Sequence, residues 1–541
     1  MSLSENTDAA AVVPAAESAA DQRLQRLATL EKLLAAGVNP FGGRVDDRLG
    51  TEEARQDYLE AEQALAQEVS MAGNPAMGMP GALGTVPSVP TTPLQVQAPE
   101  IPATLAGRVM TMRLMGKSIF ADLRDDNGRM QLYAQKNVLG DEAFAAFKAL
   151  DLGDWISVRG QIFKTRAGEV TLRVQSFELQ SKALRPMPEK WHGLTDVEQR
   201  YRQRYVDLIG NEDARRLFRR RAEMIRQIRD VLAAKGFMEV ETPMLQPIPG
   251  GAAARPFKTF YNALDCPMYL RIAPELYLKR LLVGGFGKVY EINRNFRNEG
   301  LSRRHNPEFT MLEIYEAFGD CRTMMDLVEE LVTTVAERTL GSLEVTNAEG
   351  KVISLKRPWR RATYADLVCE KMGGDWHALP RDEKQSRARA LGLKVDESWN
   401  DQEITHEIYE KTIEATLLQP TFVTRLPAEL VPLAKRCADD PSVVDVFELE
   451  INGQEIAPGY SELNDPVEQR RRFEAQAKRV HGTVDEESGT VDEDFLTALE
   501  FGMPPAGGMG MGIDRLVMLL TGSASIRDVI LFPQLRPEKS A

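Results

Sequence analysis

The stretch from Lys288 to Glu316, KVYEINRNFRNEGLSRRHNPEFTMLEIYE, constrains the fold of this chain more than any other. It predicts two strands joined by a loop near residues 298–306. Side chains on a strand alternate between its two faces. Apolar residues of the first strand such as Ile292 therefore share one face, polar residues such as Glu291 share the other, and the second strand alternates in the same way. We expect the apolar face to pack inward and the polar face to look outward.

Two roles are open for this polar face. A solvated outer face is common in antiparallel sheets. However, Asn is a poor strand residue, and the first strand carries both Asn293 and Asn295. Phe309 shares the polar face of the second strand, and His305 lies in the loop. A face that combines Arg, Glu, His and Phe suits a nucleotide together with a zwitterion, so we predict a ligand site here.

The composition is that of a globular protein with several domains. The chain has 541 residues, of which 43% are hydrophobic and 27% are charged, and this length exceeds that of a typical single domain. A net charge of −13 argues against a general nucleic-acid binder, so any RNA contact must be local. Four widely separated cysteines indicate a reducing cytoplasm and no zinc site. No apolar run is long enough to span a membrane, and the acidic start lacks the basic region of a secretory signal.

Five regions are predicted along the chain from its composition and periodicity. They are a tail and two helices over 1–71, a linker rich in Pro, Gly and Ala over 72–99, a β-rich domain over 100–182, a connector over 183–211, and a large C-terminal domain over 212–541.

Residues 100–182 predict five short strands with a helix between the third and the fourth, which is the pattern of an OB-fold. OB-folds commonly bind single-stranded nucleic acid, and a small barrel without such a ligand is the alternative. In a nucleic-acid binder, Phe120 could stack on a base, Gln131 could read the edge of that base, and Arg113 could hold a phosphate.

A second hairpin is predicted over Asp445–Pro466, with Asn452-Gly453 at its turn. This arrangement lets Glu448 and Glu455 face each other. Paired carboxylates need a cation between them, or one of them must be protonated. Mg²⁺ prefers oxygen ligands, so we consider a magnesium site here, with two exposed edge carboxylates as the alternative.

The motifs FRNEG and RHNPEFTMLEIY closely resemble motif 2 of the class II aminoacyl-tRNA synthetases, in the form found in the lysyl-tRNA synthetase family. The resemblance extends from about Gly107 to Pro537. It implies an α+β multidomain fold, in which an N-terminal OB-fold β-barrel precedes a class II antiparallel sheet flanked by helices. It also implies four segments: motif 1 at about 212–243, motif 2 at about 288–316, an insertion at about 320–445 and motif 3 at about 502–520.

The resemblance further implies an activity and its partners. A member of this family activates L-lysine with ATP, releases pyrophosphate, and transfers the lysyl group to the 3′ end of tRNA(Lys). Mg²⁺ accompanies the ATP. The family forms homodimers through motif 1, with Pro243 at the partner subunit, and it works in the cytoplasm without a membrane.

Roles for individual residues also follow from the resemblance. Arg297 would hold the α-phosphate and the substrate carboxylate, Arg515 the γ-phosphate, and these two are the expected catalytic residues. The remaining positions are Glu299, His305 and Phe309 for ATP; Gly251, Glu275, Glu313, Tyr315, Tyr460 and Glu462 for lysine; Glu448 and Glu455 for the metal; and Arg113, Phe120, Gln131 and Glu169 for the anticodon.

A structural role stays open for Glu275, and two rival functions remain for the whole chain. Glu275 could simply interact with the dipole at the start of a helix, whereas a buried Glu462 would need a cationic partner such as the lysine side chain. One rival function is that of a related enzyme that transfers lysine to a protein, although such relatives lack the OB domain. The other is that of an RNA-binding protein whose synthetase domain has lost its activity.

Pro458 departs from the family pattern, in which most lysyl enzymes have Asn two residues before the aromatic residue. That Asn can donate a hydrogen bond to the substrate carboxylate, and Pro cannot. We therefore expect Pro458→Asn to lower the Michaelis constant for lysine by up to about tenfold, since a net hydrogen bond contributes about 0.5–1.5 kcal/mol. Steady-state kinetics measures this constant, and an unchanged or higher value would contradict the expectation.

Overall fold

The computed structural model describes residues 19–72, 99–187, 194, 196–252, 254–480 and 491–538. Most of the predicted linker over 72–99 and the first 18 residues lie outside this part. The chain forms two compact units, Met1–Glu189 and Lys190–Ala541.

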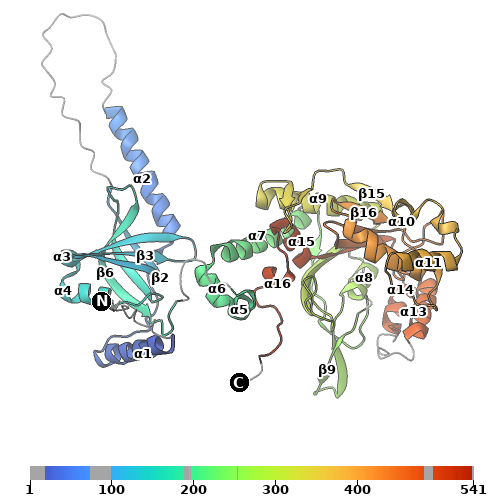
Figure 1. Cartoon of the computed structure of the whole chain (residues 1–541), viewed down its shortest axis with the longest axis horizontal. Coiled ribbons are helices and arrows are strands. Elements are labelled where there is room, and N and C mark those ends of the chain that lie inside the picture. The colour runs from blue at the N-terminus through green and yellow to red at the C-terminus, as the bar shows by residue number, and fades with distance from the viewer. Residues whose placement is uncertain are drawn as a thin grey trace, which may run out of the picture. The chain divides into compact units, whose positions relative to one another are not determined.

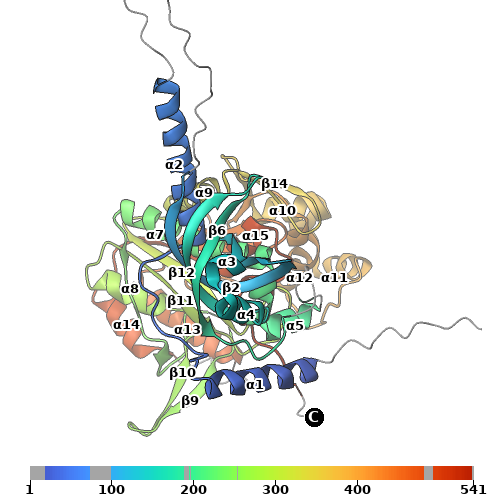
Figure 2. The ribbon, with the colours of Figure 1, turned by 90° about the vertical axis from the view of Figure 1, so that its left-hand side faces the viewer.

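The first unit contains the predicted OB-fold barrel (Figure 2). Its strands are β1 (Arg48–Leu49), β2 (Ile101–Met115), β3 (Ser118–Arg124), β4 (Arg129–Gln135), β5 (Trp155–Lys164) and β6 (Val170–Ser181). The order is β1-β2-β3-β4-β6-β5, and an additional pairing of β2 with β5 closes the barrel. The helices α3 (Lys136–Leu139) and α4 (Asp141–Lys148) occupy the predicted position between β4 and β5.

Two further helices, α1 (Ala19–Ala35) and α2 (Thr51–Ala72), match the predicted N-terminal pair. The first turns of α2 join the barrel core, because Ala54 and Tyr58 are buried there. Thr51 anchors the start of the helix, and its backbone N–H and its hydroxyl both donate to the Asp125 carboxylate, at 2.8 and 2.7 Å. The rest of α2 extends beyond the barrel (Figures 1 and 2).

An eight-stranded sheet forms the centre of the second unit, in the order β15-β16-β17-β18-β19-β12-β11-β7. Its strands are β7 (Met238–Glu239), β11 (Lys288–Phe296), β12 (Glu308–Ala317), β15 (Arg360–Thr363), β16 (Thr421–Thr424), β17 (Val446–Glu450), β18 (Glu455–Ser461) and β19 (Ala506–Gly512). Only the pairs β15–β16 and β11–β7 are parallel. The mostly antiparallel sheet of the predicted fold class is thus confirmed.

The second unit also contains helices, several of which flank this sheet (Figure 1). They are α5 (Val197–Arg202), α6 (Arg204–Gly210), α7 (Glu212–Ala234), α8 (Glu275–Val283), α9 (Cys321–Leu340), α10 (Tyr364–Met372), α11 (Arg381–Ala390), α12 (Asp401–Ile408), α13 (Pro466–Val480), α14 (Glu493–Glu500), α15 (Ile513–Thr521) and α16 (Ile526–Val529). Two smaller sheets consist of β8 (Leu245–Gln246) with β9 (Phe257–Tyr261) and β10 (Cys266–Leu270), and of β13 (Glu344–Thr346) with β14 (Val352–Ser354). Within the described ranges, no helix is both long and apolar enough to cross a bilayer.

The largest apolar core joins α7, α9 and α15 to the sheet through buried residues such as Ile228, Val328 and Leu516. Both α9 and β16 lie within the stretch expected as an insertion, so this stretch also contributes to the core. The amphipathic helix predicted near 212–235 is present. Its buried face includes Met224 and Val231, while Phe218 is only half-buried.

The polar face of β11 and β12 does not look outward, so this expectation was wrong. Glu291, Asn295 and Glu313 are each less than 5% exposed. The reason is a second layer over this face, since α8 packs on both strands. Arg271, which follows β10, also reaches over it and pairs with Glu291 at 2.7 Å. A hydrophobic pattern shows which face is apolar, but it does not show whether the other face is covered.

The second predicted hairpin is present as β17 and β18, but its register differs from the expectation. A β-bulge lies between Leu449 and Glu450, so Glu450 pairs with Glu455, and Glu448 pairs with Pro458. Such an extra residue changes which side chains face each other. The prediction that Glu448 and Glu455 are direct cross-strand partners was therefore wrong.

Candidate active site

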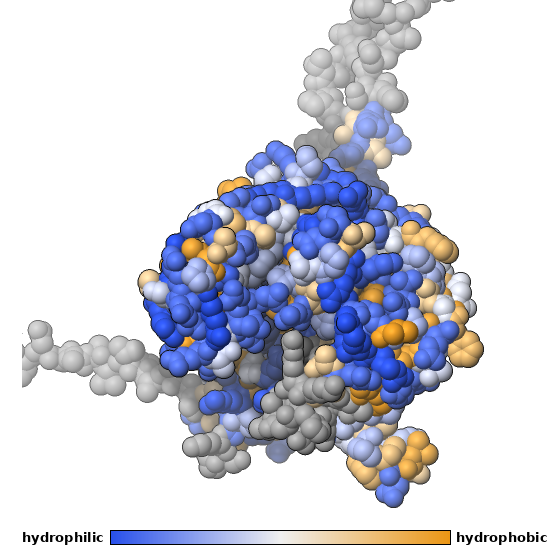
Figure 3. Space-filling view, turned by 90° about the vertical axis from the view of Figure 1, so that its right-hand side faces the viewer, coloured by the Kyte–Doolittle hydropathy of each residue, from blue (hydrophilic) through white to orange (hydrophobic). Residues whose placement is uncertain are grey.

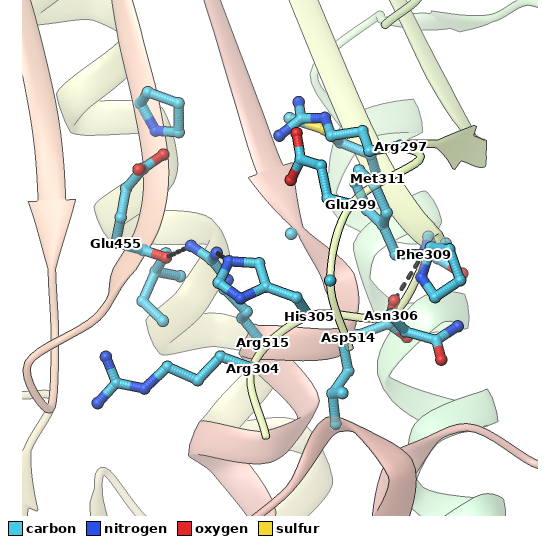
Figure 4. Close-up of a pocket in the computed structure, with 17 residues that line it drawn as sticks. Arg297, Glu299, Arg304, His305, Asn306, Phe309, Met311, Glu455, Asp514 and Arg515 are labelled. Atoms are coloured by element: carbon cyan, nitrogen blue, oxygen red, sulfur yellow. Dashed lines mark hydrogen bonds between the residues drawn. The ribbon is translucent and has the colours of Figure 1, made fainter. Parts of the chain in front are cut away.

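A cavity of about 190 Å³ opens between the motif 2 loop, β12, β18 and the start of α15 (Figure 4). All five residues predicted to bind ATP line it, namely Arg297, Glu299, His305, Phe309 and Arg515. Glu455 and Pro458 also contribute to its wall. The structure therefore brings together side chains from three segments that are far apart in the sequence.

The cationic side chains of this cavity are held in defined positions. The Arg297 guanidinium lies over the Phe309 ring, 5.2 Å from its centroid. Burial lowers the pKa of Arg297, but a guanidinium remains charged in proteins. Arg515 donates a hydrogen bond of 2.7 Å to the backbone carbonyl of Glu455, and its other terminal nitrogen lies 3.4 Å from His305 Nε2. Partial burial and then Arg515 lower the pKa of His305, so this imidazole is neutral at neutral pH.

Asp514 connects the three motifs beneath the cavity. It is buried, and its carboxylate pairs with Arg221 of α7 at 2.6 Å and accepts the backbone N–H of Thr310 at 2.8 Å. Arg221 also donates to the Thr310 hydroxyl at 3.2 Å. These contacts join α7, β12 and α15, and they fix the strand and the helix that carry Phe309 and Arg515.

Next to Arg297 lies a cluster of buried carboxylates formed by Glu275, Glu313 and Glu462, which are 6%, 4% and 1% exposed. The Tyr460 hydroxyl donates to Glu275 Oε1 at 2.7 Å, and the Tyr315 hydroxyl donates to Glu313 Oε2 at 3.1 Å. These five residues, all predicted for the amino-acid site, thus come from α8, β12 and the end of β18.

Two glycines allow the side chains of this cluster to pack closely against the backbone. A Cβ on Gly251 would lie 3.1 Å from the Cβ of Glu275, which places this predicted residue beside the cluster. A Cβ on Gly508 of β19 would lie only 1.9 Å from Glu462 Oε1 and 2.6 Å from the Tyr315 ring. No side chain fits at position 508 without displacing Glu462.

Lys279 is the residue of this cluster that the sequence analysis missed. Its side chain is fully buried, and its Nζ lies 2.8 Å from Glu275 Oε1 and 2.5 Å from Glu462 Oε2. The signal was available locally, because Lys279 follows Glu275 by four residues in PELYLKR and therefore shares its face of the helix. The contact with Glu462, 183 residues further along, could not be read from spacing.

Burial also shifts the ionisation of this cluster. It raises the pKa of Glu313 to about 8, with Glu275 adding to the effect. It likewise raises the pKa of Glu462 to about 8, although Lys279 opposes this shift. Burial acts to lower the pKa of Lys279, but Glu275 and Glu462 outweigh it, and the net shift is upward. A buried site in which carboxylates outnumber cations favours a cationic ligand.

A second group of carboxylates lies beside the cavity and includes Glu414, Glu448, Glu450 and Glu455. Burial, followed by the charge of Glu455, raises the pKa of Glu448 to about 8. Glu450 Oε2 is buried without a hydrogen-bond partner among the described residues. Within that part of the chain, no three acidic, His or Cys side chains are arranged as a complete metal site. Two carboxylates are nevertheless sufficient for Mg²⁺, which keeps several waters and substrate phosphates as ligands.

The predicted anticodon residues lie together on one face of the barrel in the first unit. Phe120 pairs with Arg113 on β2 and with Tyr133 on β4. The rings of Phe120 and Tyr133 stack, with centroids 4.7 Å apart. Gln131 accepts a hydrogen bond from the Thr171 hydroxyl at 3.0 Å.

Glu169 lies at the edge of this face and pairs with Arg129 at 3.4 Å. The sequence analysis missed the other aromatic residues of the face. Phe163 lies 6.1 Å from Tyr133, and the Arg173 guanidinium covers its ring at 4.7 Å.

Glu313→Gln should flatten the pH dependence of stability. The folded chain holds the Glu313 proton up to about pH 8, whereas the unfolded chain releases it near pH 4.5, so this group makes the fold less stable as the pH rises between these values. Gln does not titrate. We expect the variant to lose about 1–2 kcal/mol less than the wild type between pH 6 and 8.

Urea unfolding at both pH values, without ligand, measures this difference. Glu316→Gln is the matched control, because it removes a carboxylate from the same strand that pairs with Lys288 nearer the surface. An equal loss of stability in wild type and Glu313→Gln would contradict the expectation.

Comparison with known proteins assigns these features to a family. The family model of class II tRNA synthetases (D, K and N) matches residues 196–536, and the model of an OB-fold nucleic acid binding domain matches residues 103–180. The lysine-tRNA ligase of Carboxydothermus hydrogenoformans is 50% identical over 518 residues, which cover 95% of this chain and 97% of the relative.

Two other relatives with the same name give a similar result. The enzyme of Moorella thermoacetica is 48% identical over 97% of this chain and 99% of its own, and that of Xylella fastidiosa (strain 9a5c) is 53% identical over 80% and 86%. With this similarity over both units, the chain belongs to the class II tRNA synthetases, in the branch of the lysine-tRNA ligases.

Proposed function

We propose that this chain activates L-lysine with ATP to lysyl-adenylate, releases pyrophosphate, and then transfers the lysyl group to the 3′ end of tRNA(Lys). The observation that carries the proposal is the buried acidic cluster that ends at Glu462, next to an Arg297 that also lines the cavity. An amino acid with a cationic side chain suits this cluster. The arrangement brings its carboxylate close to a nucleotide in the cavity.

The adenylation step needs no nucleophile from the protein. The lysine carboxylate attacks the α-phosphate of ATP, and pyrophosphate leaves on the opposite side. Catalysis then consists of positioning and charge neutralisation. Arg297 binds the α-phosphate and the substrate carboxylate, and Arg515 binds the γ-phosphate. Phe309 stacks on adenine, Glu299 reads its amino group, and the neutral His305 contacts the phosphates.

The amino acid binds in the acidic cluster. Glu275 and the backbone of Gly251 hold the α-amino group, and Glu462 pairs with the ε-ammonium. Tyr315 and Tyr460 line the side-chain stem, with Glu313 behind them. Glu462 Oε1 supports this assignment, because it is buried and has no hydrogen-bond partner in the described part of the chain.

Glu448 and Glu455 are the residues that would hold Mg²⁺. When bound, the ion supplies positive charge to the phosphates of ATP. The raised pKa of Glu448, caused first by burial and then by Glu455, supports a cation at this place. Glu455 also lines the cavity.

In the first unit, the anticodon binds to the barrel. Phe120 stacks on a base, Gln131 reads the edge of that base, Arg113 contacts phosphate, and Glu169 lies at the edge of this surface. Half-exposed aromatic rings on a barrel face support this role. The enzyme works in the cytoplasm. Because the OB-fold is present, transfer of lysine to a protein is the less favoured alternative.

Exchange of pyrophosphate into ATP, dependent on an amino acid but without tRNA, tests the function directly. Of the twenty amino acids, lysine alone should support exchange, because Glu462 requires an ammonium on a long stem. Glu462→Gln should reduce the exchange by at least about a hundredfold, as expected when one partner of a buried charge pair is removed. Exchange with another amino acid would refute lysine as the substrate. No exchange at all would favour the alternative of an inactive RNA-binding protein.

In this proposal the chain forms a homodimer through motif 1, and exposed apolar side chains on a second segment extend the interface. The hairpin of β9 and β10 projects from the second unit, and apolar atoms gather on it (Figures 1 and 3). Phe260, Tyr261 and Leu264 are 52%, 49% and 67% exposed. Single exposed apolar residues are common, but a contiguous group often marks an interface.

Sedimentation velocity should therefore give the mass of two chains. Leu264→Lys should shift the equilibrium toward one chain, because it places a charge in the interface. Val467→Lys is the control, since Val467 is 77% exposed on α13. A wild type that sediments as one chain at micromolar concentration would refute the dimer, and an unaltered dimer in Leu264→Lys would exclude this hairpin from the interface.

A further inference from the structure

The acidic cluster holds an internal ammonium before any ligand arrives. Lys279 Nζ lies 2.8 Å from Glu275 Oε1 and 2.5 Å from Glu462 Oε2, and its side chain is inaccessible to solvent. It also lies 5.6 Å from the centroid of the Tyr460 ring. These three neighbours are residues that we assign to the amino-acid site. Lys279 thus contacts residues of the site, although its own side chain is buried.

We propose that Lys279 is a positioning residue for the amino-acid substrate, whose ammonium binds one oxygen of Glu275 and one of Glu462 and so leaves the second oxygen of Glu462 to receive the substrate ammonium. This inference rests on the proposed function. It extends that function to a residue that does not touch the substrate.

The two oxygens of Glu462 support this division. Oε2 faces Lys279 at 2.5 Å. Oε1 lies against the backbone of Gly508 and near the Tyr315 ring, and it is not the oxygen that pairs with Lys279. A carboxylate that is held at one oxygen by a fixed cation cannot rotate freely. Its other oxygen is therefore presented in a defined direction.

The charges of the cluster also support this role of Lys279. Its carboxylates are Glu275, Glu313 and Glu462, and Lys279 is the cation among them. The remaining groups that face it are the hydroxyls of Tyr315 and Tyr460, the Arg297 guanidinium, which interacts with Glu313, and the pair formed by Arg271 and Glu291 at 2.7 Å. Lys279 pairs with Glu275 and Glu462 together, so one ammonium is shared by two carboxylates, and a cationic substrate adds the positive charge that this sharing leaves unmatched.

Replacing Lys279 removes this support. In Lys279→Met, Glu462 faces an apolar group instead of a cation. The protonated form of Glu462 is therefore favoured more strongly than in the wild type, and the substrate ammonium meets a neutral acid. We expect the KM for lysine in ATP–pyrophosphate exchange to rise by about tenfold or more at pH 7, with kcat within about threefold of the wild type, since one pKa unit corresponds to a tenfold change. The increase in KM should be smaller at pH 9, because a larger fraction of Glu462 is ionised in the variant at that pH than at pH 7. Lys279→Arg keeps the charge and should restore part of the affinity.

The matched control is Lys384→Met. Lys384 is also a buried lysine with one carboxylate partner, Asp401 at 2.8 Å, but it lies on α11 outside the site. It should leave the KM for lysine unchanged at both pH values. If Lys279→Met does not fold, Lys279→Gln provides the same comparison with a polar side chain of similar length.

The outcomes separate the two proposals. If the wild type shows no exchange with lysine and calorimetry detects no lysine binding, the proposed function fails, and this inference fails with it. If the wild type is active but Lys279→Met or Lys279→Gln has the KM of Lys384→Met, or raises KM by the same factor at pH 7 and pH 9, then only the role of Lys279 is refuted. A rise in KM that shrinks at pH 9, with kcat retained, supports it.

Discussion

The second unit depends on the burial of ionised groups against one face of its central sheet. A carboxylate transferred from water into a protein interior is strongly destabilised unless a cation and hydrogen bonds compensate for the loss. Here α8 and the strand β10 close over β11 and β12, and each brings a cation to that face. Arg271 pairs with Glu291, and Lys279 pairs with Glu275 and Glu462. Without these cations the second layer could not lie on so acidic a surface.

The same constraint explains why a cavity with cationic side chains and an acidic cluster can lie side by side. The motif 2 loop carries Arg297 at the boundary, with the cavity on one side and the acidic cluster on the other. Asp514 fixes β12 and α15 relative to α7 through Arg221. The cationic and anionic halves of the site are therefore parts of one rigid framework, and a ligand of mixed charge can span them without a large rearrangement of either half.

Much of the fold could be predicted from the sequence, because local patterns determine it. The alternation of apolar and polar residues, together with turn residues, predicted β3, β4 and β5 with the bounds that the structure shows. The family motifs predicted which residues meet in the cavity. Three features could not be predicted from the sequence and became visible only in the structure. The cover over the polar face comes from distant segments, and the register of β17 and β18 depends on a bulge. The contact of Lys279 with Glu462 joins a helix to the residue that follows β18, 183 positions away. The roles assigned to individual site residues stay predictions.

Gly508 has a consequence for how deep Glu462 can lie. The backbone of β19, rather than a side chain, lies against Glu462 Oε1 and the Tyr315 ring. A wall formed by a side chain can be moved back by substituting a smaller residue, but glycine has no side-chain atoms to remove. Substitutions at this position can only push Glu462 and Tyr315 away from the strand. The depth at which Glu462 lies is thus limited by the position of a strand in the sheet, and Glu462 could lie deeper only if the sheet itself moved.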